Sequence, residues 1–168
     1  VIYGMSAFGL TNATDLTLAE AENFIETYFK EFPGVKTFLE GIKEKAAKDG
    51  YVETLLGRRR YFPNLQKGDS HLIRQREERE AINAPIQGTA ADIIKLAMLK
   101  LPGELVKTGL RARMNLQVHD ELMFEVPEVE LEATTALVKD VMENAYRLDI
   151  PLSTEAKAGR SWGEMKKL

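Results

Sequence analysis

Two stretches in which apolar side chains recur at every second position, residues 114–118 and 122–126, constrain the fold of this chain most strongly. A period of two is the pattern of a strand with one buried face, so the pair predicts a half-buried β-hairpin that ends at Pro127. The turn between them is His119-Asp120-Glu121, although Asn-Gly or Asp-Gly would strain a tight turn less. Such a turn can hold a carboxylate on a rigid support, as a Mg²⁺ site requires; the alternative is a solvated acidic turn.

The composition of the chain is that of a folded globular protein. It has 168 residues, 44% apolar and 29% charged, enough for one ordinary domain or two interlocked subdomains. It contains no cysteine, which excludes disulfides, thiolate metal sites and cysteine nucleophiles. No apolar run approaches the roughly 20 residues of a membrane span, and no signal-peptide pattern opens the chain. We therefore expect an intracellular protein with no membrane partner.

Positive charge is concentrated in one stretch of an otherwise acidic chain. The net charge is −3, but residues 57–80 hold seven basic and four acidic side chains, which leaves −6 for the remainder. A local basic stretch on an acidic body is typical of a surface that faces phosphates. The alternative is a solvated face with ion pairs, which two i,i+4 Arg–Glu spacings in residues 74–80 favour. The triplet Arg58-Arg59-Arg60 has no acidic residue at such a spacing.

Helical patterns dominate the rest of the chain, and with a small, mostly antiparallel sheet they predict the α+β class. The sequence Thr17-Leu18-Ala19-Glu20 is a capping box, and Pro33 suits the first turn of the following helix. The predicted elements are helices 17–30 and 33–49, strands 51–55 and 59–62, a loop at 64–70, helices 70–83 and 86–101 separated at Pro85, a short helix between 103 and 109, the hairpin at 113–126, a helix at 128–146 and a strand at 152–158.

Four segments, in order along the chain, resemble motifs of family A DNA polymerases, the DNA polymerase I type. VIYGMS at 1–6 looks like the end of the fingers helix, and YVETLLGRRR at 51–60 is similar to the arginine-tipped ribbon of the fingers. NAPIQGTAAD at 83–92 resembles the helix start that faces the primer–template minor groove, and LQVHDEL at 116–122 resembles the motif C hairpin. The resemblance implies the C-terminal part of a helical fingers subdomain at 1–83 and the C-terminal part of a palm, with packed helices and a small sheet, at 84–168.

The resemblance also implies an activity, namely template-directed nucleotidyl transfer to a primer 3′-hydroxyl in DNA replication or repair. Asp120 corresponds to one of two aspartates that hold a pair of Mg²⁺ ions, for which hard carboxylate oxygens are suitable ligands. Glu121 is the adjacent catalytic carboxylate, with a supporting role. His119 would contact the phosphate or sugar at the primer end; alternatively it is a structural histidine.

Further residues of the motifs would contact DNA. Gln87 and Asn83 would hydrogen-bond the minor-groove edge or the template backbone, where every Watson–Crick pair offers acceptors. Without the resemblance, Gln87 reads as an amide that caps its own helix. The small residues after Gln87 would allow close approach to DNA or, alternatively, tight helix packing. Arg79 would contact the primer strand or stabilise the motif C turn.

The basic triplet and an aromatic residue complete the expected DNA site. Arg58, Arg59 and Arg60 would hold template phosphates by charge-assisted hydrogen bonds, and we expect one of the three to face the interior. Tyr3 matches the aromatic that occupies the stacking position of the templating base beside the incoming nucleotide; taken alone, it reads as a core aromatic.

Parts of the family's active site lie outside this sequence. The motif A aspartate and the basic fingers residues that hold the triphosphate are missing, and the apolar opening VIYGMS is unlike an exposed terminus. We therefore expect the C-terminal part of a longer, bacterial-type cytoplasmic polymerase. It would be inactive alone, and its partners would be primer–template DNA, dNTP and the N-terminal remainder that carries motif A.

Two other functions remain open at this point. The first is a non-catalytic nucleic-acid-binding module that uses the basic ribbon and no metal, although an anionic turn gives such a module no advantage near phosphates. The second is an HD-type metal phosphohydrolase, suggested by His119-Asp120. That class needs several histidine ligands, and His71 is the only other histidine of the chain.

Overall fold

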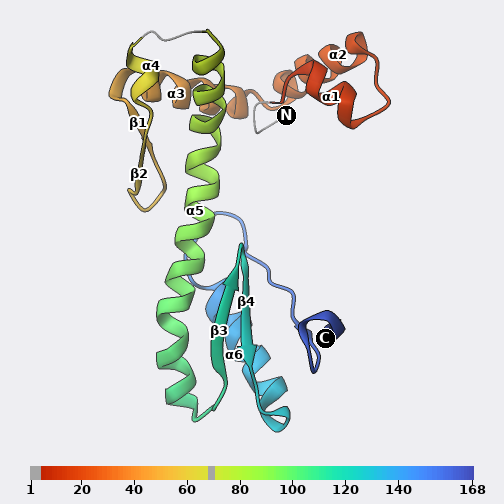
Figure 1. Ribbon diagram of the computed structural model, residues 1–168, viewed down its shortest axis with the longest axis vertical. Helices are drawn as coiled ribbons and strands as arrows, with labels where there is room; N and C mark the ends of the chain where they lie inside the picture. Colours follow the sequence, from red (N-terminus) through yellow and green to blue (C-terminus); the bar gives the residue numbers. More distant parts are fainter. Residues whose placement is uncertain (1–4, 68–70) are drawn as a thin grey trace. The chain divides into compact units, whose positions relative to one another are not determined.

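Helices α2 and α3 have their predicted capping residues in a computed structural model that describes residues 5–67 and 71–168 (Figure 1), whereas helix α1 was not predicted. Thr17 and Glu20 form the reciprocal capping box at the start of α2. Pro33 occupies the first turn of α3, and Gly50 ends that helix at φ 76°, where its N–H donates to the carbonyl of Ala46. The element bounds are α1 Ala7–Ala13, α2 Leu18–Glu31, α3 Pro33–Asp49, β1 Tyr51–Glu53, β2 Arg59–Tyr61, α4 Pro63–Lys67, α5 His71–Thr108, β3 Arg113–Val118, β4 Glu121–Glu125, η1 Glu128–Glu130, α6 Leu131–Glu143, β5 Lys157–Ala158, η2 Trp162–Glu164 and β6 Lys166–Lys167.

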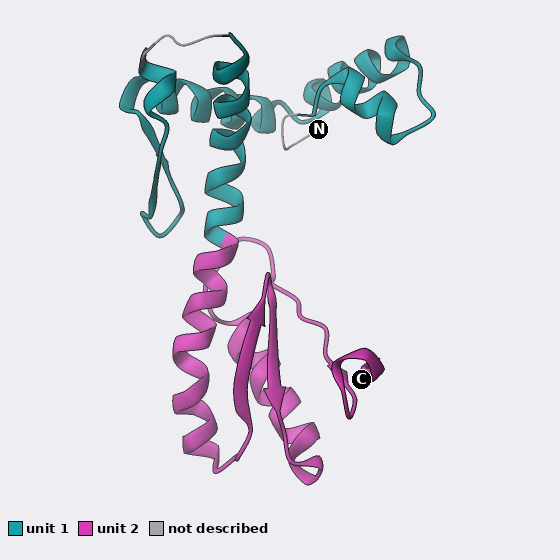
Figure 2. Cartoon of the chain, viewed as in Figure 1, with its two compact units in different colours: residues 1–89 teal, residues 90–168 magenta. Residues whose placement is uncertain are grey.

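The described strands form three separate antiparallel pairs, β1–β2, β3–β4 and β5–β6. The α+β class is thereby confirmed. The fold divides into two units, residues 1–89 and residues 90–168 (Figure 2). Helix α5 contributes its residues up to Thr89 to the first unit and the rest to the second. The division of the chain into fingers at 1–83 and palm at 84–168 stays a prediction.

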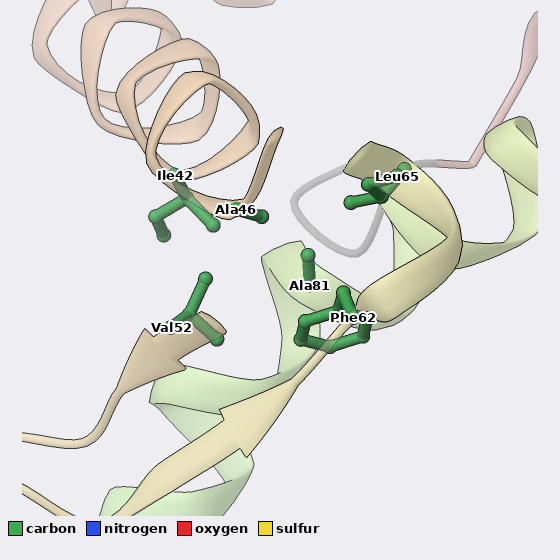
Figure 3. Packing of buried hydrophobic residues seen from close by; sticks show 6 residues of the cluster. All are labelled: Ile42, Ala46, Val52, Phe62, Leu65 and Ala81. Atoms are coloured by element: carbon green, nitrogen blue, oxygen red, sulfur yellow. The ribbon is translucent and has the colours of Figure 1, made fainter. Parts of the chain in front are cut away.

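The first unit has a small core at one end of α3 (Figure 3). Side chains from α3, β1, α4 and α5 meet there, together with the residue that follows β2. The members are Ile42, Ala46, Val52, Phe62, Leu65 and Ala81. Leu65 corrects one prediction: residues 63–67 form helix α4 and not a loop, because burial of Leu65 in this core stabilises a turn that its polar neighbours do not predict.

Helix α5 is continuous from His71 to Thr108, so the predicted breaks at Pro85 and Pro102 are wrong. A proline removes one hydrogen bond to the carbonyl four residues earlier, but the flanking bonds can carry the helix through when both sides are packed. Ile82 is buried before Pro85, and Leu101 and Leu105 are buried on either side of Pro102. Gly109 ends the helix at φ 71°.

The second unit packs α6 and the segment after it against the later part of α5. Its core holds Ile93 and Ala97 of α5 with Ala145, and partly buried apolar residues surround them. The predicted strand at 152–158 is reduced to Lys157–Ala158. Thr154 is instead bound to Glu143 of α6, whose carboxylate accepts from its backbone N–H at 2.8 Å and from its hydroxyl at 2.9 Å.

The hairpin predicted at 113–126 is present as β3 and β4 (Figure 1). Its strand register shifts between Met114 and Leu116, as in a β-bulge. The shift interrupts the simple alternation, and Leu116 is 46% exposed although its pattern predicts an inward position. None of the described helices combines the length and apolar character that a bilayer span requires.

Candidate functional site

The turn of the β3–β4 hairpin carries Asp120 at the predicted place. Val118 pairs with Glu121, so His119 and Asp120 form a two-residue turn. His119 has φ 53°, the left-handed region that costs a side-chain-bearing residue on the order of 1 kcal/mol. The side-chain amide of Gln117 donates to the carbonyl of His119 at 3.0 Å and supports this conformation. The hairpin therefore holds an exposed carboxylate at its end.

The donor chemistry of this turn fits a hard cation in part. Asp120 and Glu121 are carboxylates, and Mg²⁺ is commonly held by one or two carboxylates together with waters and substrate phosphates. Within residues 5–67 and 71–168, no three His, Asp or Glu side chains gather to form a metal site. The turn can thus supply part of a Mg²⁺ coordination shell, and further ligands must come from other groups.

Three of the predicted DNA-contacting residues lie at successive i,i+4 positions of α5. Arg79, Asn83 and Gln87 therefore share one face of the helix. Arg79 and Gln87 are exposed, and Asn83 between them is half-buried. The Oδ1 atom of Asn83 is buried and accepts no hydrogen bond from the described residues. The sequence predicts Asn83 and Gln87 on different helices, so only the continuous α5 brings them into one row.

The basic triplet has protein partners that its local sequence does not reveal. Arg60 donates to Glu80 of α5 at 2.6 Å, and Arg59 donates to Glu53 of β1 at 2.9 Å. The β1–β2 pairing places Arg59 directly opposite Glu53, which is why no helical spacing could predict the contact. All three arginines are exposed, so the expectation that one faces the interior is wrong.

One face of the β1–β2 ribbon holds a cluster of charged and aromatic side chains. Glu53 accepts hydrogen bonds from Lys45 at 2.8 Å and from Arg59 at 2.9 Å. The guanidinium of Arg59 lies over the ring of Tyr51, 4.4 Å from its centroid, and Tyr61 contacts the same ring. The hydrogen bonds from Lys45 and Arg59 lower the pKa of Glu53 and raise the pKa of both basic groups.

These pKa shifts predict how the stability of the ribbon depends on pH. Because the pKa of Glu53 is lower in the folded chain, its contribution is fully present above the ordinary value of 4.5 and is lost as the pH falls through the folded-state pKa. We expect Glu53→Gln to lower the melting temperature near pH 7 and to have little effect at the acid end. Thermal melts of both proteins from pH 7 to 3 measure this, with the exposed Glu44→Gln as control. A difference that does not change with pH would contradict the prediction.

Three residues at the contact between the ribbon turn and α5 were not singled out as functional from the sequence. Thr54 lies in the ribbon turn, and Gly88 and Thr89 follow Gln87 on α5. The only sequence signal for them is the run of small residues after Gln87, which allows either close approach to DNA or tight helix packing. Gly88 packs against Thr54, so packing is one use of that run. Tyr3 lies outside the described residues.

The sequence of the chain matches the model of one protein family. The match is to DNA polymerase family A and extends over residues 1–164. The chain therefore belongs to DNA polymerase family A, as the resemblance of the four segments predicted.

Particular relatives agree with this assignment. The chain is 51% identical over 166 residues to the thermostable DNA polymerase I of Thermus filiformis, which covers 99% of this chain and 20% of that protein. It is 46% identical over 166 residues to DNA polymerase I of Streptococcus pneumoniae, with 99% and 19% covered. This chain thus spans about a fifth of the length of the curated relatives that it matches.

A solved structure has the same fold. The POL domain of Pol1 from M. smegmatis, in complex with DNA primer-template and dNTP, is similar with a TM-score of 0.83 and 48% sequence identity. The match covers 90% of this chain and 27% of that chain.

Proposed function

We propose that this chain forms part of a DNA-directed DNA polymerase, which transfers nucleotides from dNTP to a primer 3′-hydroxyl under the direction of a template. The observation that carries the proposal is the likeness, over 90% of the chain, to a polymerase domain whose structure holds DNA primer-template and dNTP. At 48% identity, a shared site chemistry is the simplest expectation. We assign residues 1–83 to the fingers and residues 84–168 to the palm.

Asp120 would hold catalytic Mg²⁺, and Glu121 would support it. Family A polymerases use divalent metal ions, and the exposed turn offers carboxylate oxygens of the kind that Mg²⁺ prefers. When bound, the metal supplies charge stabilisation at the primer 3′-hydroxyl and at the leaving pyrophosphate. The hairpin would fix the position of the Asp120 carboxylate. The left-handed conformation of His119 and its hydrogen bond from Gln117 support the turn that carries this residue. His119 would contact the primer end.

The row on α5 would bind the primer–template. Gln87 and Asn83 would donate to minor-groove acceptors, which every Watson–Crick pair presents, so that pair geometry is sensed without reading sequence. The shared helix face supports this role, because Asn83 lies one turn before Gln87 on α5 and both side chains carry amide donors. Arg79, one turn earlier on the same face, would contact the primer strand.

The basic triplet would hold template phosphates, and Tyr3 would stack with the templating base near the incoming nucleotide. Among the three arginines, Arg58 is the strongest candidate. Its guanidinium donates to the carbonyl of Gly88, the residue after Gln87, so it lies beside the row on α5 that would bind DNA. Arg59 and Arg60 are paired with Glu53 and Glu80.

The remaining partner would be an N-terminal polymerase segment that supplies the motif A aspartate and the triphosphate-binding residues. We propose that the chain does not polymerise without it, and that the complete enzyme works in the bacterial cytoplasm. The chain spans about a fifth of its curated relatives, which supports this division of the active site.

The experiment is primer extension by this chain mixed with a separately made N-terminal complement, in the presence of Mg²⁺ and dNTP. We expect extension by the mixture and none by either part alone. A mixture that binds primer–template and does not extend it would favour the non-catalytic nucleic-acid-binding module instead. A mixture that does not bind primer–template would contradict both the polymerase proposal and the nucleic-acid-binding module.

A further inference from the structure

The turn of the β1–β2 ribbon is fastened to α5 immediately after Gln87. The turn comprises residues 54–58 between the two strands, and its contacts on the helix are Gly88 and Thr89. Three different interactions join them, and no two involve the same pair of residues. All of them lie within the first unit.

The first contact is a hydrogen bond to a buried hydroxyl. The backbone N–H of Leu55 donates to Oγ1 of Thr89 at 3.0 Å, and Thr89 is only 8% exposed. This bond joins residues that lie 34 positions apart in the chain. Removing the hydroxyl would leave the partly buried N–H of Leu55 without this partner and would loosen the contact.

The other two contacts are made at Gly88. A Cβ atom at this position would lie 2.6 Å from Cγ2 of Thr54, so only glycine allows the turn to come this close. The guanidinium of Arg58 donates to the carbonyl oxygen of Gly88 at 2.9 Å. Thr54 and Arg58, at the two ends of the turn, therefore both contact one residue of the helix.

The turn itself is closed by internal hydrogen bonds. The backbone N–H of Arg58 donates to Oγ1 of Thr54 at 3.1 Å, and the N–H of Thr54 donates to the carbonyl of Arg58 at 3.0 Å. Gly57 takes φ 81°, which allows the chain to reverse. A closed turn with three attachments has little freedom to move along the helix.

We propose that Thr54, Gly88 and Thr89 are positioning residues that hold Arg58 at a fixed place beside Gln87. The template-phosphate contact of Arg58 and the minor-groove contact of Gln87 then act as one rigid unit, because Gln87 and Gly88 are neighbours in the helix. This inference rests on the proposed function, since it concerns how the DNA contacts of the polymerase are arranged. It assigns a positioning role to three residues for which no DNA contact is proposed.

The salt dependence of DNA binding tests the inference. Each phosphate contact contributes about 0.7–0.9 to the slope of log affinity against log salt. In the chain mixed with its N-terminal complement, we expect Thr89→Val to weaken primer–template binding and to reduce that slope by about one contact. Fluorescence anisotropy at several salt concentrations measures both. A merely structural loss would lower the folded fraction and leave the slope unchanged.

Two control variants and one alternative variant complete the design. Thr89→Ser keeps the hydroxyl and should restore the slope of the wild type. Thr108→Val makes the same change at an exposed position of the same helix and should have no effect. If Thr89→Val folds poorly, Gly88→Ala tests the same attachment of the ribbon turn to α5, because it disturbs the contact with Thr54.

Hydrogen exchange of the Leu55 amide, together with the salt slope, distinguishes failure of the positioning role from failure of the proposed function. In Thr89→Val this amide should exchange faster than in Thr89→Ser, whether or not DNA is present. Faster exchange with an unchanged salt slope would overturn the positioning role and leave the polymerase proposal standing. Wild-type protein that fails to bind primer–template would instead overturn the proposed function and the inference with it.

Discussion

Replacing Asp120 by asparagine is expected to abolish primer extension by the mixture of this chain with its N-terminal complement. Asparagine keeps the size of the side chain and removes the negative charge that we propose holds Mg²⁺. Metal stabilisation of transition-state charge is worth several kcal/mol, so a rate loss of about 10³-fold or more is expected, since each 1.36 kcal/mol is a factor of ten. Single-turnover extension with saturating dNTP measures the loss.

The position of Asp120 means that this substitution should change activity and leave stability nearly unchanged. The residue lies in an exposed turn, so thermal unfolding should shift by no more than about 0.5 kcal/mol. Asp149→Asn makes the same chemical change at another exposed position and should extend primers at the wild-type rate. Extension by Asp120→Asn at a rate close to that of Asp149→Asn would remove Asp120 from the mechanism.

Truncation of Phe62 to alanine is expected to produce the largest loss of stability in the first unit. Phe62 is 2% exposed and lies in the core between α3, β1, α4 and α5. Phenylalanine-to-alanine changes in such positions cost about 3–5 kcal/mol, because a cavity remains after the transfer energy is lost. Urea unfolding followed by circular dichroism measures the change.

Phe38→Ala provides the matched control. Phe38 belongs to α3 and is 50% exposed, so the same truncation should cost much less. Phe62 also follows the last strand of the ribbon directly, so its loss should speed amide exchange at Val52 on the partner strand. Equal destabilisation by the two variants would mean that the core described around Phe62 does not support this unit.

Local chemistry explains which elements could be predicted from the sequence. Caps act over three or four residues, so the Thr17–Glu20 box, Pro33 and Gly50 predicted the ends of α2 and α3. The period of two on each side of Asp120 predicted the hairpin and its turn for the same reason. The family followed from four short motifs whose order along the chain is itself information.

Long-range packing explains the errors. Pro85 and Pro102 predict helix breaks only when their neighbours are free to unwind, and here Ile82 and Leu101 are buried beside them. Leu116 has the right period for the interior, but a register shift in the β3–β4 pairing disturbs the alternation. At the two prolines, the free energy of burying their apolar neighbours exceeds the local tendency to break the helix. At Leu116, the strand pairing decides which face the side chain takes, and the alternation of apolar residues does not.

The sequence by itself determined the family, the carboxylate turn, the capped helices and the residue types from which a DNA site could be assembled. Only the tertiary structure decided that Arg79, Asn83 and Gln87 share a helix face, that Arg59 and Arg60 pair with distant glutamates, and that Gly88 and Thr89 fasten the ribbon turn to α5. The physical reason is separation along the chain. The Leu55–Thr89 contact joins residues 34 positions apart, and no local pattern encodes a bond that depends on how a ribbon and a helix pack together.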